Sequence, residues 1–212
     1  MLVSCWSVKG GSGCSTVAAA LALHAADRGG GLAVDLRADL VGLLGIAQPA
    51  VGLGSWAMAY PDVATDALAR IEVELCDGVG LLPGGPEQIA PELPSAVLTG
   101  LLARDPRVVV VDCGTDERWR YGVVPHCDRS VLVMNPCYVS CARAACGPTP
   151  TSVVVVRAPW HAIGDREVET VVGAPVVASI PLDRAVATAT DAGLFLARVP
   201  RVVRRAMDGA LR

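Results

Sequence analysis

Short, nearly continuous runs of apolar residues recur along the chain, and segments of mixed polarity separate them. A Val-rich run of this length is typical of a strand that is covered on both faces of its sheet. The runs lie at Leu2–Val8, Leu32–Leu36, Val79–Leu82, Arg107–Val111, Ser130–Met134, Ser152–Val156 and Pro175–Ile180. Segments able to form helices separate them, so the pattern predicts an α/β fold with about seven strands in one mostly parallel sheet.

The first two runs frame a strand–loop–helix–strand unit. The apolar run Leu2–Val8 stops at the glycine-rich stretch Lys9–Gly13, and Ser15–Arg28 then has the Ala- and Leu-rich composition of a helix. Gly29–Gly31 ends this helix, and Leu32–Leu36 is the next strand. The chain therefore opens with a βαβ unit.

The remaining segments are less regular. Residues 40–75 contain Gly52, Gly54 and Pro61 and are expected to form short helices, and Pro83–Pro94 is expected to be a proline-rich loop. No composition shift divides the chain, so we expect one domain over residues 1–212.

Composition and charge exclude several classes of protein. The net charge is −3, from 18 basic and 21 acidic residues, so no overall field attracts nucleic acid or anionic lipid. No apolar stretch approaches the roughly 20 residues that span a bilayer, and no basic segment with an apolar core stands at the N-terminus. We therefore expect a soluble, cytoplasmic protein, for which nucleic acid is a possible but not an indicated partner.

Eight cysteines lie in apolar contexts, which favours reduced thiols over disulfides. Cys137, Cys141 and Cys146 follow one another at intervals of four and five residues. Two interpretations stay open for these three: a metal site, or buried and helix-face thiols.

The glycine-rich loop is the strongest candidate site. Glycines allow successive backbone N–H groups to point inward, and the following helix adds positive potential, so the loop suits a polyphosphate. The alternative is an ordinary glycine turn with a serine cap, but its place between a buried strand and a helix favours nucleotide binding. The expected nucleotide-binding residues of the loop are Gly10, Gly11, Ser12, Gly13, Cys14, Ser15 and Thr16.

The loop resembles the KGGxGK[ST]T loop of the MinD/ParA family of deviant Walker A ATPases, in which a signature lysine precedes the glycines. Lys9 matches that lysine. The resemblance covers nearly the whole chain, since further segments resemble the family's switch I strand end, third strand exit, Walker B strand and IPxD turn. These are Val34-Asp35, Leu81–Gly85, Val108–Asp112 with Cys113-Gly114, and Ile180–Asp183.

The resemblance implies a three-layer P-loop NTPase fold and ATP or ADP with Mg²⁺, held between the subunits of a homodimer. It implies that Lys9 reaches the partner's phosphates, that Asp35 and Asp112 are catalytic carboxylates, and that Ser15 and Asp112 hold the Mg²⁺ ion. The base-recognition end implies Arg157 and Pro181 as nucleotide-binding residues. However, Val156 stands where the family often has the asparagine that reads adenine.

Two positions depart from the family pattern. Cys14 replaces the P-loop lysine, which removes a charge-assisted hydrogen bond worth about 1.5–3 kcal/mol, or roughly tenfold to a hundredfold in affinity. Arg37 stands where the family usually has a second acid that orients water, and Asp39 is a weak candidate to replace that acid. Arg37 either restores part of the missing positive charge at the phosphates or is a solvated loop arginine.

The Cys14 thiol has a second interpretation. A thiol at a helix N-terminus among backbone N–H groups can have a depressed pKa and raised reactivity, which would suit a redox sensor. The alternative is a small residue that is tolerated at this position.

Two surfaces are candidates for partner contacts. The segment Val199–Arg212 places apolar residues at helical spacing with arginines between them, which fits either a membrane-surface helix or a helix packed on the core. Trp119-Arg120-Tyr121 follows the Walker B strand, where the family's dimer interface lies, and is expected either to contact a partner or to pack within the fold.

The sequence therefore predicts a divergent MinD/ParA-like homodimer with little or no ATP hydrolysis. It resembles most the TadZ/CpaE subset, whose members localise pilus or secretion machinery, so protein partners are expected. The first alternative is an active ATPase that positions DNA or cell-division proteins. The second is a thiol- or metal-sensing protein built on a degenerate P-loop.

Overall fold

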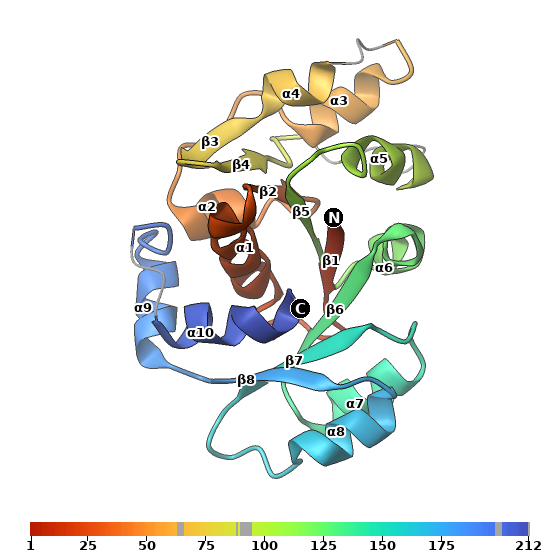
Figure 1. Cartoon of the computed structure of the whole chain (residues 1–212), viewed down its shortest axis with the longest axis vertical. Coiled ribbons are helices and arrows are strands. Elements are labelled where there is room, and N and C mark those ends of the chain that lie inside the picture. Colours follow the sequence, from red (N-terminus) through yellow and green to blue (C-terminus); the bar gives the residue numbers. More distant parts are fainter. Residues whose placement is uncertain (63–65, 88, 90–94, 198–200, 212) are drawn as a thin grey trace.

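The computed structural model of the chain describes residues 1–62, 66–87, 89, 95–197 and 201–211, and within these ranges eight strands form one sheet (Figure 1). Their order across the sheet is β3-β4-β2-β5-β1-β6-β7-β8. The strands are β1 (Leu2–Trp6), β2 (Gly31–Asp35), β3 (Val73–Cys76), β4 (Val79–Leu82), β5 (Val108–Gly114), β6 (Arg129–Met134), β7 (Ser152–Arg157) and β8 (Val176–Pro181).

Helices connect the strands and cover both faces of the sheet. The α-helices are α1 (Cys14–His24), α2 (Leu40–Leu44), α3 (Leu53–Ala59), α4 (Ala67–Ile71), α5 (Ser95–Leu102), α6 (Glu117–Gly122), α7 (Tyr138–Ala145), α8 (Asp165–Val172), α9 (Arg184–Asp191) and α10 (Arg201–Ala210). The 3₁₀ helices η1 (Ala25–Arg28) and η2 (Val124–His126) extend α1 and follow α6. Figure 1 shows α1, α2, α9 and α10 on one side of the sheet and α5, α6, α7 and α8 on the other.

The predicted α/β class is confirmed, and each of the seven predicted strands is present. The sheet has one strand more than expected, because β3 pairs antiparallel with β4 at the edge. The prediction of short helices for residues 40–75 is therefore wrong for residues 73–75, which lie in β3. The side chains of β3 alternate between half-buried and exposed, as in an edge strand. Asp77-Gly78 makes the hairpin turn to β4, with Gly78 at φ 74°.

Strand alternation divides the core into two layers. In β1, Leu2 and Trp6 join the core on the α5–α8 side, whereas Val3 and Cys5 join the core on the α1–α10 side. All five residues of β1 are buried, as expected for a central strand covered on both faces. This explains why the strand runs are continuously apolar rather than alternating.

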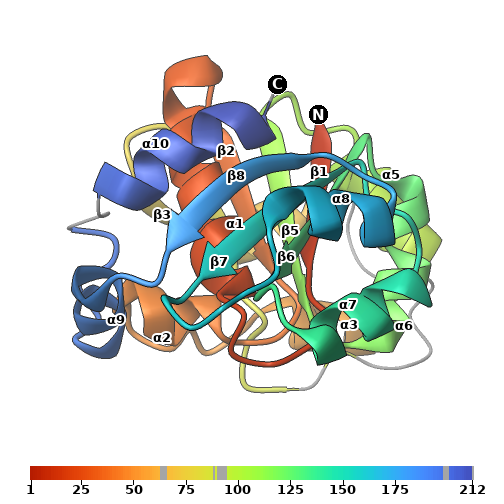
Figure 2. The same ribbon diagram turned by 90° about the horizontal axis from the view of Figure 1, so that it is seen from below.

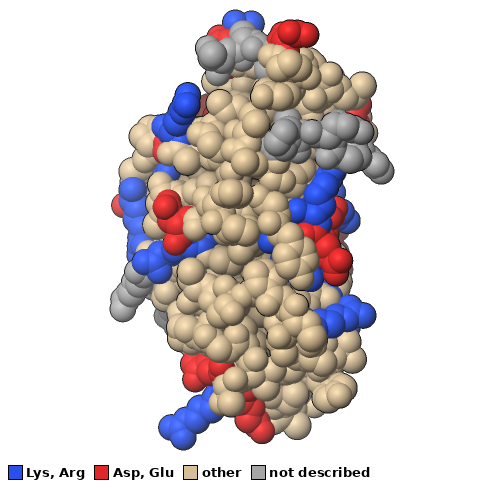
Figure 3. Space-filling model, turned by 90° about the vertical axis from the view of Figure 1, so that its right-hand side faces the viewer, with Lys and Arg blue, Asp and Glu red and all other residues tan. Residues whose placement is uncertain are grey.

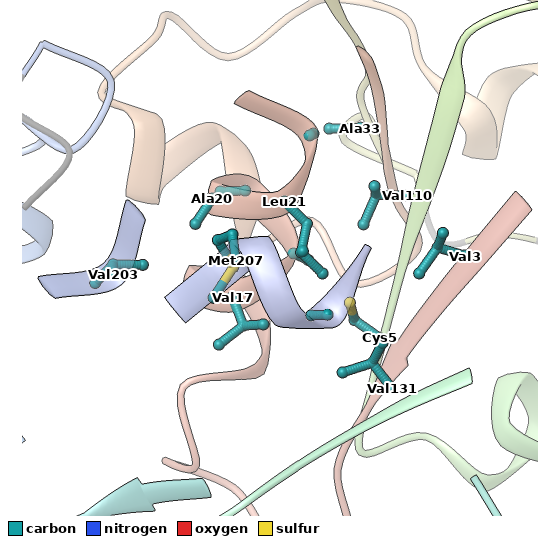
Figure 4. Close-up of a cluster of buried hydrophobic side chains, with 14 of the residues drawn as sticks. Val3, Cys5, Val17, Ala20, Leu21, Ala33, Val110, Val131, Val203 and Met207 are labelled. Atoms are coloured by element: carbon teal, nitrogen blue, oxygen red, sulfur yellow. The ribbon is translucent and has the colours of Figure 1, made fainter. Parts of the chain in front are cut away.

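The C-terminal helix α10 belongs to the second core layer. Val203 and Met207 are 1% and 0% exposed and belong to the same buried cluster as Val17 and Leu21 of α1, and Figure 4 shows Met207 beside Val17. Ala210 and Leu211 are buried in the same cluster. For the described side chains of 199–212, packing on the core is confirmed. Val199, Pro200 and Arg212 lie outside the described residues.

The parallel topology brings one end of the central strands together. Asp35 at the end of β2 is in register with Asp112 of β5, and Cys5 of β1 is in register with the same Asp112. The loop from β1 to α1 leaves from this carboxyl edge, whereas the N-terminus and the end of α10 lie at the opposite edge (Figure 2). In open parallel sheets this edge, near the point where the strand order reverses, is where ligands bind.

The surface seen in Figure 3 is mostly uncharged, and its charged side chains form small groups that contain both signs. Among the described residues, none of the helices combines the length and the apolar character that crossing a bilayer requires.

Candidate functional site

The glycine loop is curled by its own backbone and by two serine hydroxyls. Gly11 and Gly13 have φ of 73° and 83°, in the left-handed region that favours glycine. The carbonyl oxygen of Lys9 accepts hydrogen bonds from Ser7 Oγ at 3.0 Å and from Ser12 Oγ at 2.7 Å. These contacts fix the turn immediately before α1 begins at Cys14.

A cleft of about 600 Å³ opens over this loop at the carboxyl edge of the sheet. Its size is that of a small-molecule site. The lining contains both predicted site residues and residues that were not predicted. It consists of Ser7, Lys9, Gly10, Gly11, Ser12, Gly13, Cys14, Ser15, Thr16, Arg37, Asp39, Gly42, Leu43, Gly114, Thr115 and Thr190. The whole predicted loop therefore faces one cleft.

Thr115 and Thr190 are among the lining residues that the sequence did not identify. Thr115 comes directly after β5, so its position at a carboxyl strand end was the available signal. Thr190 lies in α9, far along the chain, and no local pattern marks it.

Cys14 is buried, and its thiol donates a hydrogen bond to Oδ1 of Asp112 at 3.4 Å. Burial raises the pKa of this thiol well above its ordinary value, and the negative charge of Asp112 raises it further. Burial and the nearby carboxylate thus both oppose the lowered thiol pKa that the redox hypothesis requires.

Asp112 lies at the end of the predicted Walker B strand and is completely buried. Burial raises its pKa, while the Ser15 hydroxyl, the Gly114 N–H and the Cys14 thiol act in the opposite direction. Its Oδ1 accepts the Gly114 N–H at 3.0 Å, whereas its Oδ2 has no hydrogen-bond partner within the described part of the chain. A buried carboxylate oxygen without a partner, beside a serine hydroxyl, fits a site for Mg²⁺ and its waters.

Asp35 is also buried, but backbone groups occupy both of its oxygens. Oδ1 accepts the N–H groups of Arg37 and Asp39 at 3.1 and 3.2 Å, and Oδ2 accepts that of Leu40 at 2.9 Å. Burial, followed by the charge of Asp112, raises its pKa to about 6. Asp35 therefore holds the backbone of the loop that places Arg37 and Asp39 at the cleft.

Arg37 lies across one wall of the cleft. A Cβ built on Gly114, which has φ 55°, would meet Arg37 Cγ at 2.8 Å, so the arginine stem packs on this glycine. Its Nη1 donates to Asp116 Oδ2 at 3.3 Å, and the two side chains are 40% and 28% exposed. Arg37 is therefore a half-exposed cation at the rim of the cleft, held by one surface ion pair.

The expected base-recognition residues separate in the structure. Pro181 lines a largely apolar pocket of about 390 Å³ that shares Gly11, Gly13 and Thr16 with the cleft. Arg157 is not in the described lining of either; its guanidinium donates to Ile163 O and pairs with Asp165. The prediction of Arg157 as a nucleotide-binding residue does not fit this geometry, because the loop after β7 holds its side chain.

The aromatic and cysteine residues named as candidates differ in exposure. Trp119 is fully buried in the core, so the prediction of a partner contact through its indole is wrong, whereas Tyr121 is 55% exposed. No three His, Cys, Asp or Glu side chains of the described ranges come together as a metal site. Cys141 is buried, and Cys137 shares a 3.3 Å hydrogen bond with Ser140, which contributes most to lowering the pKa of the Cys137 thiol.

Comparison with known proteins places this arrangement among solved structures. No protein-family model matches the sequence, and no curated protein sequence matches it. The structure is similar to a ParA family ATPase from Chlorobium tepidum TLS, with 21% identity, a TM-score of 0.79 and coverage of 100% of this chain and 97% of that one.

It is also similar to the septum site-determining protein MinD of Pyrococcus horikoshii OT3, solved with Mg-ADP, with 20% identity, a TM-score of 0.79 and coverage of 97% and 92%. A MinC:MinD cell division protein complex of Aquifex aeolicus gives 18% identity, a TM-score of 0.77 and coverage of 100% and 94%. At such identities the likeness establishes the fold: an α/β P-loop architecture shared with MinD and ParA proteins over the full chain.

Proposed function

We propose that the chain is a MinD/ParA-like nucleotide-binding protein that forms homodimers and localises or scaffolds other proteins, with little or no ATP hydrolysis. The observation that carries the proposal is the cleft lined by the whole Lys9–Thr16 loop, with the Asp112 Oδ2, which has no partner in the described residues, buried beside Ser15. In this proposal the nucleotide is ATP or ADP with Mg²⁺, and it is the similarity to MinD with Mg-ADP that supports the choice.

The residues divide the work of binding. The N–H groups of Gly10–Gly13 and the N-terminus of α1 would hold the phosphates, while Ser15 and Asp112 would hold Mg²⁺, which neutralises phosphate charge when bound. The apolar pocket containing Pro181 adjoins the loop and would take the base. Asp35 positions the Arg37–Asp39 loop through its three backbone hydrogen bonds.

Weak hydrolysis follows from two substitutions in the cleft. Cys14 brings no charge to the phosphates, and its thiol bonds to Asp112 instead. Arg37, in the place of a water-orienting acid, cannot accept a proton from water at neutral pH. Asp39 lines the cleft and is the described carboxylate available for that task.

The dimer and the localisation role are proposed from Lys9 and from the structural neighbours. Lys9 is exposed at the mouth of the cleft, and its ammonium forms no hydrogen bond or ion pair within the described ranges, so it is available to the phosphates of a second subunit. The MinC:MinD complex supports a protein partner. The TadZ/CpaE-like role at pilus or secretion machinery is proposed because loops in that subset also depart from the catalytic pattern.

Calorimetric titration of the protein with ATP and ADP in the presence of Mg²⁺, with light scattering to follow the oligomeric state, tests the proposal. Saturable binding and nucleotide-dependent dimerisation without turnover is the expected result. The absence of nucleotide binding would overturn it.

A second candidate, an active ATPase that positions DNA or cell-division proteins, is favoured by Lys9 and Ser15 in the lining of the cleft and by the buried Asp112 beside Ser15. Turnover that Lys9→Ala and Asp112→Ala both abolish would establish this candidate. Salt-sensitive binding to non-specific DNA would be the sign of a DNA-positioning role.

A further inference from the structure

A second cleft, of about 680 Å³, lies on the other side of Lys9 from the phosphate loop. Three cations and one acid line it together with apolar groups. The lining is Val8, Lys9, Gly10, Thr115, Glu117, Arg120, Tyr121, Ala142, Arg143 and Cys146. The charged part of the described lining is thus net positive.

Arg120 is the least exposed of the three cations. Only 6% of this residue is exposed, and its Nη2 donates to the backbone oxygens of Ser7 at 2.9 Å and Thr115 at 3.3 Å. Its Nε is buried without a hydrogen-bond partner in the described structure. Neutral carbonyl oxygens do not balance its charge, and the one described acid near it, Glu117, is 3.8 Å away and 78% exposed. A buried guanidinium with so weak a counterion favours the approach of an anion.

The other two cations, Arg143 and Lys9, are exposed and lie at the Val8-Lys9 segment. Arg143 of α7 donates through Nη1 to the Val8 carbonyl oxygen at 3.1 Å, which places it beside the start of the glycine loop. Lys9 lines both this cleft and the cleft over the loop. An anion bound here would therefore lie next to the lysine that also serves the nucleotide cleft.

The surroundings of the cleft are those of a protein interface rather than of a site for a simple anion. Tyr121, in the lining, is 55% exposed, and Tyr138 is 81% exposed. Tyr138, Ala142 and Cys146 follow at intervals of four residues from the start of α7, so Tyr138 extends the cleft along one helix face. Exposed tyrosines next to arginines are typical of the energetic centre of protein interfaces.

We propose that in the nucleotide-free chain the cleft between α6 and α7 binds an acidic segment of a partner protein, whose carboxylates meet Arg120 and Arg143 while its apolar side chains contact Tyr121 and Tyr138. This deepens the proposed function, because it names the chemistry of the localised partner and the surface that takes it. Peptide binding is measured without added nucleotide, so a failure of this proposal and a failure of nucleotide binding are distinguishable.

The test uses the full chain without nucleotide and two fluorescent synthetic peptides, one of alternating Glu and Leu and one of alternating Gln and Leu. Fluorescence anisotropy is expected to show saturable binding of the Glu peptide that weakens with added salt, and no binding of the Gln peptide. Arg143→Glu should weaken the Glu peptide by at least about tenfold, because it replaces a rim cation with a like charge. Tyr138→Ser should weaken it as well.

Arg166→Glu, on the exposed surface of α8, is the matched charge reversal outside the cleft and should leave the affinity unchanged. Equal binding of the Gln peptide, or full affinity in Arg143→Glu, would overturn the proposal. So would displacement of the Glu peptide by inorganic phosphate at an equal concentration, which would mark a simple anion site. Sedimentation with anionic vesicles, or self-association that Arg143→Glu abolishes, in the absence of peptide binding would assign the cleft to lipid or to a second copy of the chain and would also overturn it.

Discussion

The thiol of Cys14 donates a hydrogen bond to Oδ1 of Asp112, with 3.4 Å between sulfur and oxygen. The residue that stands where a P-loop lysine would reach the phosphates thus ties α1 to the end of β5. One oxygen of Asp112 is used in this contact and in the bond from the Gly114 N–H, while the other has no partner in the described structure. One carboxylate oxygen thus remains without a partner in the described residues, next to a loop that lacks the P-loop lysine charge.

Replacing Cys14 by lysine is expected to strengthen nucleotide binding roughly tenfold to a hundredfold, because it supplies a charge-assisted hydrogen bond worth about 1.5–3 kcal/mol. Titration calorimetry with ATP and Mg²⁺ measures the change. Cys14→Ala is the matched control, since it removes the thiol without adding a charge and should leave the affinity within about twofold. If lysine and alanine have the same effect, the missing cation does not limit binding.

The thiols of Cys14 and Cys137 are expected to react at very different rates. The pKa of Cys14 is raised well above its ordinary value, chiefly by burial, whereas that of Cys137 is lowered by its hydrogen bond to Ser140 and, to a smaller extent, by the charge of Lys9. Because the thiolate is the nucleophile, iodoacetamide near neutral pH should alkylate Cys137 long before Cys14. Mass spectrometry of tryptic peptides over time gives the order, and unfolding in guanidinium should make the two rates similar. Early labelling of Cys14 in the folded protein would contradict its burial.

The folded state is expected to lose stability as the pH rises from about 4 to about 6. Asp35 has its pKa raised to about 6, so in this window the folded state binds a proton that the unfolded state has already lost. This stabilisation is fully present below the pKa of Asp35 in the unfolded chain and is lost above its pKa in the folded chain. For a shift of this size the loss amounts to about 3 kcal/mol. Urea unfolding at several pH values measures it.

Asp35→Asn isolates that contribution. The substitution should reduce the slope of the unfolding free energy against pH by up to about 1.4 kcal/mol per pH unit, the value for one proton. It also disturbs the backbone hydrogen bonds of Asp35 and so lowers stability at every pH. Asp112, whose pKa is raised in the same direction, accounts for a remaining slope. An unchanged slope in Asp35→Asn would show that Asp35 titrates normally in the folded protein.

Arg37→Ala is expected to weaken ATP binding by about tenfold, because Arg37 is a cation in the cleft whose P-loop lysine is absent. Its effect on folding should be small, since a half-exposed ion pair such as that with Asp116 contributes about 0–1 kcal/mol. Arg118→Ala is the matched control, because Arg118 of α6 is outside the described lining of the cleft, stacks on Trp119 and donates to Ile89 O. Equal losses in both variants would point to a general change in surface charge.

The sheet could be predicted from the sequence because its central strands are buried on both faces, so each one is a continuous apolar run. The edge strand β3 was not predicted because only Val73 and Leu75 turn inward, so it has no continuous apolar run. The Asp77-Gly78 turn was the feature of the sequence that could have indicated it. The glycine loop was predictable for a similar reason: its chemistry is local and lies between two regular elements.

Side-chain direction at the site could not be predicted in the same way. The sequence places Cys14 at a helix N-terminus, but whether its thiol meets N–H groups or the carboxylate of Asp112 depends on the register of β5 against β1. Arg157 follows β7 as a base-reading residue would, yet the 158–165 loop folds back and Asp165 takes its guanidinium. Trp119 follows β5 on a short helix, and the direction of that helix buries the indole.

The C-terminal helix offers the sharpest stability test, because the two interpretations of it predict opposite results. Met207 is fully buried between α10 and the sheet, so Met207→Ala should lower the free energy of unfolding by about 2–5 kcal/mol. A helix that lies on a membrane would instead leave the unfolding free energy of the protein in solution nearly unchanged. Urea unfolding measures the loss, and Met58→Ala, at a side chain 68% exposed on α3, is the control that should change it by less than about 0.5 kcal/mol. Equal stability of the two variants would separate α10 from the core.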